Sequence, residues 1–276
     1  MIELEWLDPL VPREPNRELE RYVKQETGRV PPHTRFFGSC PWIMRADIDF
    51  DIGSAHVNDL MDLSYLIVSR DNSCRFCYGA ARMFMRLSGK THAQIEKLEQ
   101  EVETARLEPR VNLALDFARR VSRSNPPPGL PEKKALLEAG YSEAAWEELA
   151  LYAGVVVFHN RFATLLALPP RIAERLGRSG LTGLLRFAFR KILDRVQTQG
   201  SQESASSVRH DGPFAFLTER LDGLPHARVL RKTLDEAWTS PHLPPRTKAL
   251  VFAVIARGSA PCRWSARRRA CSSPTG

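Results

Sequence analysis

The spacing of apolar residues between residues 51 and 170 most constrains the fold of this chain. Val57, Leu60, Leu63 and Ile67 recur every three or four positions, which is the spacing of one face of an α-helix. Similar segments follow, and no stretch before residue 170 alternates apolar and polar residues as a half-buried β-strand does. The sequence therefore predicts an all-α domain, and its hydrophobic fraction of 43% is sufficient for a packed core.

Capping and breaking residues divide this region into separate helices. Gly89 is typical of a helix C-terminus, and Thr91 begins a capping box ahead of the next helix. Asn125–Gly129 contains three prolines and a glycine, so it breaks the helical pattern. Ser142 then caps a long helix that runs to Leu166 and is apolar on most sides. We expect this last helix to be central.

A second apolar segment resembles the first. Leu63–Arg70 and Leu250–Arg257 share their apolar pattern and final arginine, and a cysteine follows each within a few residues. This similarity predicts a second, truncated repeat at about residues 214–262. By composition, we expect an extended N-terminal arm at 1–50, a helical domain at 51–170, a basic amphipathic helix at 171–196, a flexible linker at 197–212, and a partial second helical repeat with a basic tail at 213–276.

The net charge of +8 does not by itself predict a nucleic-acid partner. Much of the excess lies in Arg186–Arg195 and Arg257–Arg269, without interleaved aromatic residues or zinc-finger spacing. Solvent-exposed helix faces account for this excess of positive charge. For the basic amphipathic helix at Leu181–Val196, peripheral membrane contact is a second, less favoured interpretation. The most apolar stretch, Leu149–Phe158, is about half the ~20 residues that span a bilayer. With no secretory signal at the N-terminus, we expect a cytoplasmic protein without a membrane span.

Two cysteines lie where the first apolar helix gives way to the next. In the sequence Cys74-Arg75-Phe76-Cys77, the cysteines are three apart and share one helix face. At a helix N-terminus, the free N–H groups and the helix dipole stabilise a thiolate. Such settings lower a cysteine pKa from about 8.5 to roughly 3.5–7.5. The sequence therefore predicts a redox-active dithiol.

Two other interpretations of the cysteine pair remain open. The pair could be two core cysteines without chemistry. It could also bind zinc if Cys40 and His56 completed the ligand set, but their spacing matches no known ligand pattern. Five cysteines, an odd number spread unevenly, do not fit a secreted disulfide framework. We therefore favour a dithiol in a reducing compartment, with no metal and no cofactor.

The segment from about residue 59 to residue 169 resembles the carboxymuconolactone decarboxylase-like superfamily, on its AhpD-like alkylhydroperoxidase branch. The resemblance rests on the apolar helix and on the CxxC at the start of the next helix. It also rests on Gly140-Tyr141-Ser142-Glu143, which is similar to the Gly-x-Ser-(Asp/Glu) helix start of the family, and on the later helix ending Phe158–Leu166.

The resemblance implies an all-helical fold that assembles into trimers or hexamers. It implies that Cys77 attacks a peroxide and that Cys74 is the resolving cysteine. It places the acidic proton relay at Asp62, twelve residues before Cys74. The two relay histidines of the family are replaced here by Phe76 and Ala81.

With those histidines replaced, three other side chains are candidates for assisting the thiols. Arg75 could lower a thiol pKa, Tyr78 could carry a proton, and His159 could enter the site from the long helix, although a buried histidine is more often a hydrogen-bonded core residue.

The predicted function is that of a thiol-dependent oxidoreductase. It would reduce peroxides or exchange disulfides and be re-reduced by a protein dithiol. The alternative is a non-catalytic oligomeric module that binds a small ligand or a protein partner. The decarboxylase branch is a weaker third choice, because its members do not generally depend on a CxxC pair.

Overall fold

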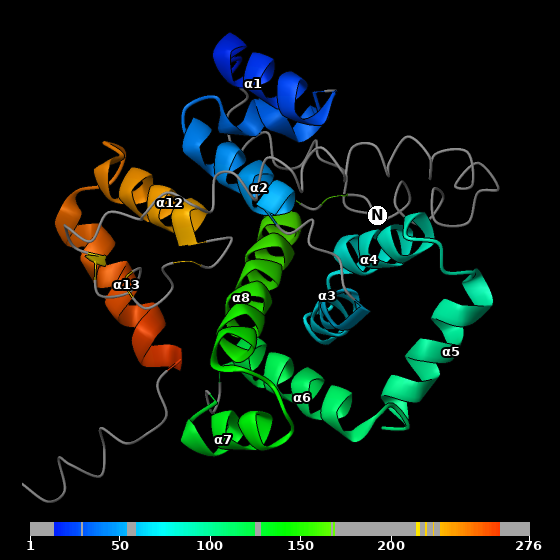
Figure 1. The fold of residues 1–276 in the computed structure, drawn as a ribbon. Helices are drawn as coiled ribbons and strands as arrows, with labels where there is room; N and C mark the ends of the chain where they lie inside the picture. Colours follow the sequence, from blue (N-terminus) through cyan, green and yellow to red (C-terminus); the bar gives the residue numbers. More distant parts are fainter. Residues whose placement is uncertain are drawn as a thin grey trace, which may run out of the picture.

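Helices are the only regular elements in the part of the chain that the structure describes, so the predicted all-α fold is confirmed. The computed structural model describes residues 14–28, 30–53, 59–124, 128–166, 168, 214, 215, 219, 223 and 227–259. Its elements are α1 (Arg17–Thr27), the 3₁₀ helix η2 (Pro32–Phe37), α2 (Pro41–Gly53), α3 (Asp59–Asp71), α4 (Arg75–Leu87), α5 (His92–Glu103), α6 (Pro109–Arg123), α7 (Leu130–Glu138), α8 (Glu143–Leu165), α12 (Ala227–Thr239) and α13 (Pro245–Ser259) (Figure 1).

The central helix of the bundle is α3, which packs against α4, α6 and α8 (Figure 1). Leu66, Ile67 and Val68 are each at most 2% exposed. Full burial of such a side chain contributes about 1.5–3 kcal/mol. These contacts hold the C-terminal end of α3 against its neighbours, and the two cysteines follow directly after that end.

Local signals set several helix boundaries, as the sequence predicts. Gly89 and Gly140 have φ angles of 106° and 88°, a left-handed conformation that glycine adopts without a steric penalty. Thr91 forms the expected capping box at the start of α5. The side chain of Ser142 accepts a hydrogen bond from the N–H of Ala145 at the start of α8.

The prediction of an extended N-terminal arm at 1–50 is wrong for residues 14–28 and 30–50, which hold α1, η2 and most of α2. In α1, Leu19 and Val23 are at most 1% exposed. They belong to a cluster with Met44 and Ile48 of α2 and with Phe162 of α8. This segment is helical because packing against α8, which lies more than a hundred residues away, buries its apolar side chains.

The α12–α13 pair contacts the remainder of the fold through α12, which packs on α2. Val229 and Leu230 lie against a cluster of α2 and α8 side chains, and Lys232 donates a hydrogen bond to Asp49 at 2.8 Å. In contrast, α13 exposes Leu250 by 58% and Val254 by 70%. The matching residues of α3 are buried, so α13 shares the apolar pattern of α3 but not its packing. The helix expected at 171–196 and the linker at 197–212 lie outside the described residues.

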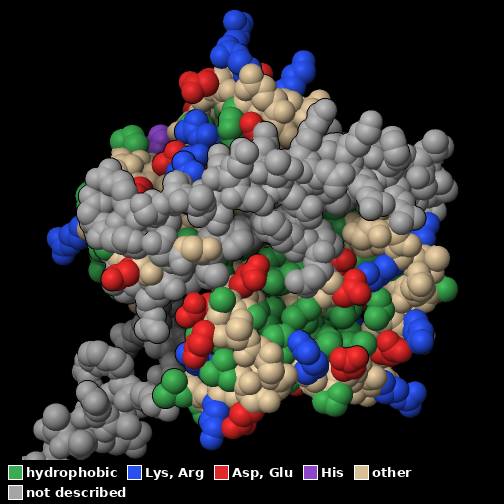
Figure 2. Space-filling model, viewed as in Figure 1, with side chains coloured by type: hydrophobic (Ala, Val, Ile, Leu, Met, Phe, Trp, Pro, Cys, Tyr) green, Lys and Arg blue, Asp and Glu red, His purple; other side chains and the backbone are tan. Residues whose placement is uncertain are grey.

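Hydrophobic side chains gather on one face of the molecule around α3, with charged side chains of both signs at their edge (Figure 2). None of the described helices combines the length and the apolarity that crossing a membrane requires.

Candidate functional site: a buried dithiol at the start of α4

A tight turn connects α3 to α4 and places both cysteines. Ser73 has a left-handed φ of 56°, and the N–H of Cys74 donates to the carbonyl of Ser69 at 2.9 Å. Cys74 is then the N-cap of α4, which begins at Arg75. The prediction that the CxxC opens a helix is therefore confirmed.

The two thiols lie one helical turn apart in a buried position. The N–H of Cys77 donates to Cys74 Sγ at 3.3 Å, and Cys77 Sγ donates to the carbonyl oxygen of His159 at 3.7 Å. Cys74 is 4% exposed and Cys77 is 1% exposed. Ala163 of α8 packs against both. Because a carbonyl oxygen can only accept, the contact with His159 requires Cys77 to keep its proton.

The surroundings of Cys74 favour its thiolate and lower its pKa to about 7. The largest contribution is a hydrogen bond from the side chain of Cys77, which forms when its single thiol proton turns from the carbonyl of His159 to the Cys74 sulfur, and burial opposes it. The N–H of Cys77 donates to the Cys74 sulfur, and the N–H of Phe76 and the side chain of Thr164 also lower its pKa. A thiol with a pKa near 7 is substantially ionised at neutral pH, so Cys74 has the character of a nucleophile.

A buried polar network fixes α8 beside this turn. Asn160 is 1% exposed, and its Nδ2 donates to Ser69 Oγ at 3.0 Å. Asn72 Nδ2 donates to Asn160 Oδ1 at 3.0 Å and also lies 3.0 Å from Ser122 Oγ of α6. Sequence reasoning missed Asn160. The signal that could have identified it is a polar residue in the apolar end of the long helix, Phe158–Leu166, because a buried amide needs hydrogen-bond partners.

His159 contributes its backbone to the dithiol, whereas its ring lies toward α2. Its carbonyl oxygen accepts the contact from Cys77. Its Nε2 is 3.9 Å from Asp47 Oδ1 of α2, and the residue is 8% exposed. The ring therefore lies on the side of α8 that faces α2.

Asp62 is buried, but the structure groups it with Lys90 rather than with the thiols. It is 7% exposed, and burial raises its pKa to about 6, with Lys90 opposing the rise and Asp59 adding to it. Lys90 lies beyond the C-terminal end of α4, a helix of 13 residues and therefore about 20 Å long, whereas Cys74 caps its N-terminus. Asp62 Oδ2 has no hydrogen-bond partner among the described residues.

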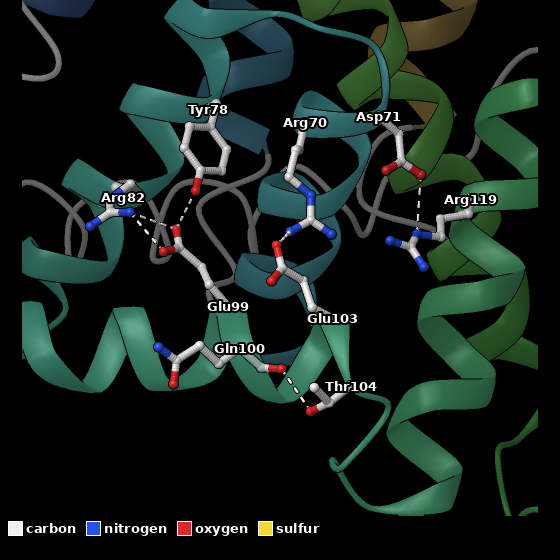
Figure 3. A network of polar contacts seen from close by, with 9 residues as sticks. All are labelled: Arg70, Asp71, Tyr78, Arg82, Glu99, Gln100, Glu103, Thr104 and Arg119. Atoms are coloured by element: carbon white, nitrogen blue, oxygen red, sulfur yellow. Dashed lines mark hydrogen bonds and ion pairs between the residues drawn. The ribbon is translucent and has the colours of Figure 1, made fainter.

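Tyr78 belongs to a separate polar network between α4 and α5 (Figure 3). Its hydroxyl donates to Glu99 of α5, and burial raises its pKa. Arg82 also binds Glu99, with its Nη1 2.7 Å from Glu99 Oε2. This network holds α5 against α4. Arg75, the other candidate beside the thiols, is exposed.

The described residues contain no group of three or more His, Cys, Asp or Glu side chains that could hold a metal ion. Cys40 lies between η2 and α2, and burial raises its pKa. His56, the other ligand considered for zinc, lies outside the described residues.

Comparison with family models, curated proteins and solved structures found no match to this chain. The resemblance to the AhpD-like branch therefore stays a prediction from its motifs.

Proposed function

We propose that this chain is a thiol-dependent oxidoreductase of the AhpD-like type that reduces a small peroxide with Cys74 and Cys77. The observation that supports the proposal is the hydrogen bond from the N–H of Cys77 to Cys74 Sγ at the N-cap of α4, which contributes to lowering the pKa of this thiol to about 7. A second thiol lies one helical turn away and retains its proton against the carbonyl of His159. We therefore assign Cys74 as the sulfur that attacks the peroxide and Cys77 as the sulfur that resolves the sulfenic acid.

The chemistry runs in three balanced steps. The Cys74 thiolate attacks the terminal oxygen of the peroxide, so an S–O bond forms, the O–O bond breaks, and the leaving oxygen takes a proton. The Cys77 thiol then attacks the resulting sulfenic acid, forming the disulfide and releasing water. A partner dithiol returns two electrons and two protons and restores both thiols.

This assignment reverses the order that the resemblance implies, in which Cys77 attacks and Cys74 resolves. Cys74 is favoured because its sulfur accepts the N–H of Cys77 at 3.3 Å, while Cys77 Sγ donates to a carbonyl oxygen. The helix dipole adds to the difference, since Cys74 is at the N-cap.

Burial favours a small oxidant over a protein disulfide. Cys74 is 4% exposed and Cys77 is 1% exposed, so a folded protein cannot reach either sulfur without movement of the helices around them. Hydrogen peroxide or a small alkyl hydroperoxide is the substrate class that fits. A protein dithiol as reductant, which reaches the Cys74–Cys77 disulfide only after the helices around it move, and a cytoplasmic location complete this proposal.

The second candidate is an oligomeric module without turnover. It is favoured by Phe76 and Ala81 at the relay-histidine positions and by the grouping of Asp62 with Lys90. An assembly such as a trimer or hexamer would also cover apolar surface that α13 exposes at Leu250 and Val254.

Single-turnover oxidation separates these candidates. The reduced protein is mixed with hydrogen peroxide, sulfenic acid is trapped with a cyclic dione, and the products are located by mass spectrometry. We expect Cys77→Ser to accumulate sulfenic acid on Cys74 and Cys74→Ser to accumulate none. Cys40→Ser is the matched control and should behave like the unmodified chain. Sulfenic acid on Cys77 alone would restore the order implied by the resemblance.

Multiple turnover with dithiothreitol and with a thioredoxin-type reductant completes the test. Peroxide consumption that depends on both cysteines supports the oxidoreductase. If neither sulfur reacts while both can be alkylated, the peroxidase proposal fails and the non-catalytic module is favoured.

A further inference from the structure

We propose that Asn160 of α8 is the positioning residue of the dithiol: its buried amide holds the carbonyl oxygen of His159 against Cys77 Sγ, and so makes Cys77 the thiol that keeps its proton. This statement concerns the state of the two thiols and can be tested without turnover. Its consequence for a peroxide, that Cys74 attacks first, rests on the proposed function.

Both ends of the Asn160 amide are bound, which fixes the side chain in one orientation. Its Nδ2 donates to Ser69 Oγ at 3.0 Å, and its Oδ1 accepts from Asn72 Nδ2 at 3.0 Å. Asn72 Nδ2 also donates to Ser122 Oγ of α6 at 3.0 Å. Because Asn160 is 1% exposed, water does not compete for these hydrogen bonds, and a hydrogen bond in the protein interior is stronger than an exposed one. The amide therefore ties α8 to the end of α3 and, through Asn72, to α6.

The same amide holds the backbone that carries Cys74. Ser69 binds Asn160 through its side chain, and its carbonyl oxygen accepts the N–H of Cys74 at 2.9 Å. Asn72, the second partner of the amide, lies inside the turn between these two residues. Two of the residues that lead to Cys74 are thus bound to one side chain of α8, so the thiols and α8 keep a fixed relative position.

The carbonyl that meets Cys77 belongs to the residue directly before Asn160. In an α-helix this carbonyl accepts the N–H four residues later, which leaves one lone pair, and Cys77 Sγ donates to it at 3.7 Å. Ala163 packs against both thiols, but apolar packing is non-directional and tolerates a small slide or rotation of α8. The hydrogen bonds of the amide depend on distance and angle. The position of the His159 carbonyl relative to Cys77 Sγ is therefore set by Asn160.

This carbonyl determines which sulfur carries the negative charge. A neutral Cys77 thiol donates to it, whereas a Cys77 thiolate would face the negative end of the carbonyl dipole, and a hydrogen bond made by the neutral form disfavours the charged form. The sulfur of Cys74 has the opposite partner, because it accepts the N–H of Cys77 at 3.3 Å. The charge is thus favoured on Cys74, and Cys77 keeps its proton whether this proton faces the carbonyl or the Cys74 thiolate.

The test measures Cys77 alone, in a Cys74→Ser parent of the full chain. Iodoacetamide is applied between pH 6 and pH 10, and modification of Cys77 is followed by mass spectrometry. In Asn160→Ala we expect the midpoint of the pH profile to move to lower pH and alkylation at pH 8 to rise about five- to tenfold, because the carbonyl is no longer held against the sulfur. Ser69→Ala removes only the acceptor of Asn160 Nδ2, so a smaller shift in the same direction is expected; this variant decides the test if Asn160→Ala does not fold.

Two controls separate positioning from a general loosening of the fold. Ala163→Gly loosens the packing on the same thiol but leaves the amide bound, so alkylation should become faster at every pH with an unchanged midpoint. Asn112→Ala removes an amide that donates to two carbonyls of the loop between α5 and α6, at 3.0 and 2.8 Å, and should leave the whole profile unchanged. The proposal is overturned if Asn160→Ala and Ser69→Ala keep the midpoint of the parent, or if either control moves the midpoint as far as they do.

The consequence for a peroxide is tested in the same variants with hydrogen peroxide and a sulfenic acid trap. The Cys74→Ser parent should form no sulfenic acid on Cys77, and adding Asn160→Ala should produce it. If the unmodified chain reacts at Cys74 but this double variant gains nothing on Cys77, the role of Asn160 in the order of attack is overturned. An absence of peroxide reaction in every variant refutes the proposed function, whereas the alkylation profiles still decide whether Asn160 positions the thiols.

Discussion

Replacing Asp62 by Asn tests the electrostatics of the core directly. Asp62 is 7% exposed, and its Oδ2 has no hydrogen-bond partner among the described residues. Burial raises its pKa from 3.8 to about 6 despite the attraction of Lys90. Ionised Asp62 therefore destabilises the folded state, and a neutral amide of the same size removes this cost.

The magnitude follows from the pKa. A rise from 3.8 to about 6 corresponds to about 3 kcal/mol, because each pKa unit is worth 1.36 kcal/mol. The folded state binds the proton more tightly than the unfolded chain does between pH 4 and pH 6. The stabilisation from protonated Asp62 is thus fully present below about pH 4 and is lost as the pH rises through 6. We expect Asp62→Asn to raise the free energy of unfolding by about 3 kcal/mol at pH 7.5 and to change it little at pH 4.

Urea unfolding at a series of pH values measures this difference. The control is Asp59→Asn, because Asp59 also interacts with Lys90 but its side chain is 81% exposed. That variant should change stability by no more than about 1 kcal/mol. Parallel pH profiles for Asp62→Asn and the unmodified chain would refute the reasoning. Loss of peroxide reactivity in Asp62→Asn would instead support the relay that the resemblance implies.

Three further predictions concern packing and assembly. Asn160→Leu should lower the free energy of unfolding in urea by about 2–4 kcal/mol, because buried partners of the amide lose their hydrogen bonds; an unchanged midpoint would contradict this. Tyr78→Phe should cost about 1 kcal/mol through the lost bond to Glu99 yet leave the Cys74 alkylation profile unchanged; a shifted profile would implicate Tyr78 in the site. Val254→Asp should reduce the mass measured by light scattering if the exposed side of α13 forms an oligomer contact, and an unchanged oligomer would exclude that contact.

The N-terminal segment shows where prediction from the sequence stops. Asn16 caps α1 by a local hydrogen bond to Leu19, a signal within a few residues. α2 begins at Pro41, a residue favoured at the first position of a helix, but the helix is stabilised by packing against α1 and α12 and by contacts of Met44 and Ile48 with Phe162 of α8. The same holds for Asn160, whose partners Ser69 and Asn72 lie 91 and 88 residues away in the chain. No pattern within a short window reveals such pairs.

Local patterns in the sequence are sufficient to predict the helical class, many helix boundaries and the placement of Cys74 at a helix start. These features depend on caps, left-handed glycines and apolar spacing, which act within one or two helical turns. Tertiary packing, by contrast, supplies the neighbours on which the proposed order of the two thiols depends. One of them is the carbonyl of His159, which is 82 residues from Cys77. Packing of α8 against the α3–α4 turn brings them together, and the chemistry of a buried sulfur is set by the neighbours that packing supplies.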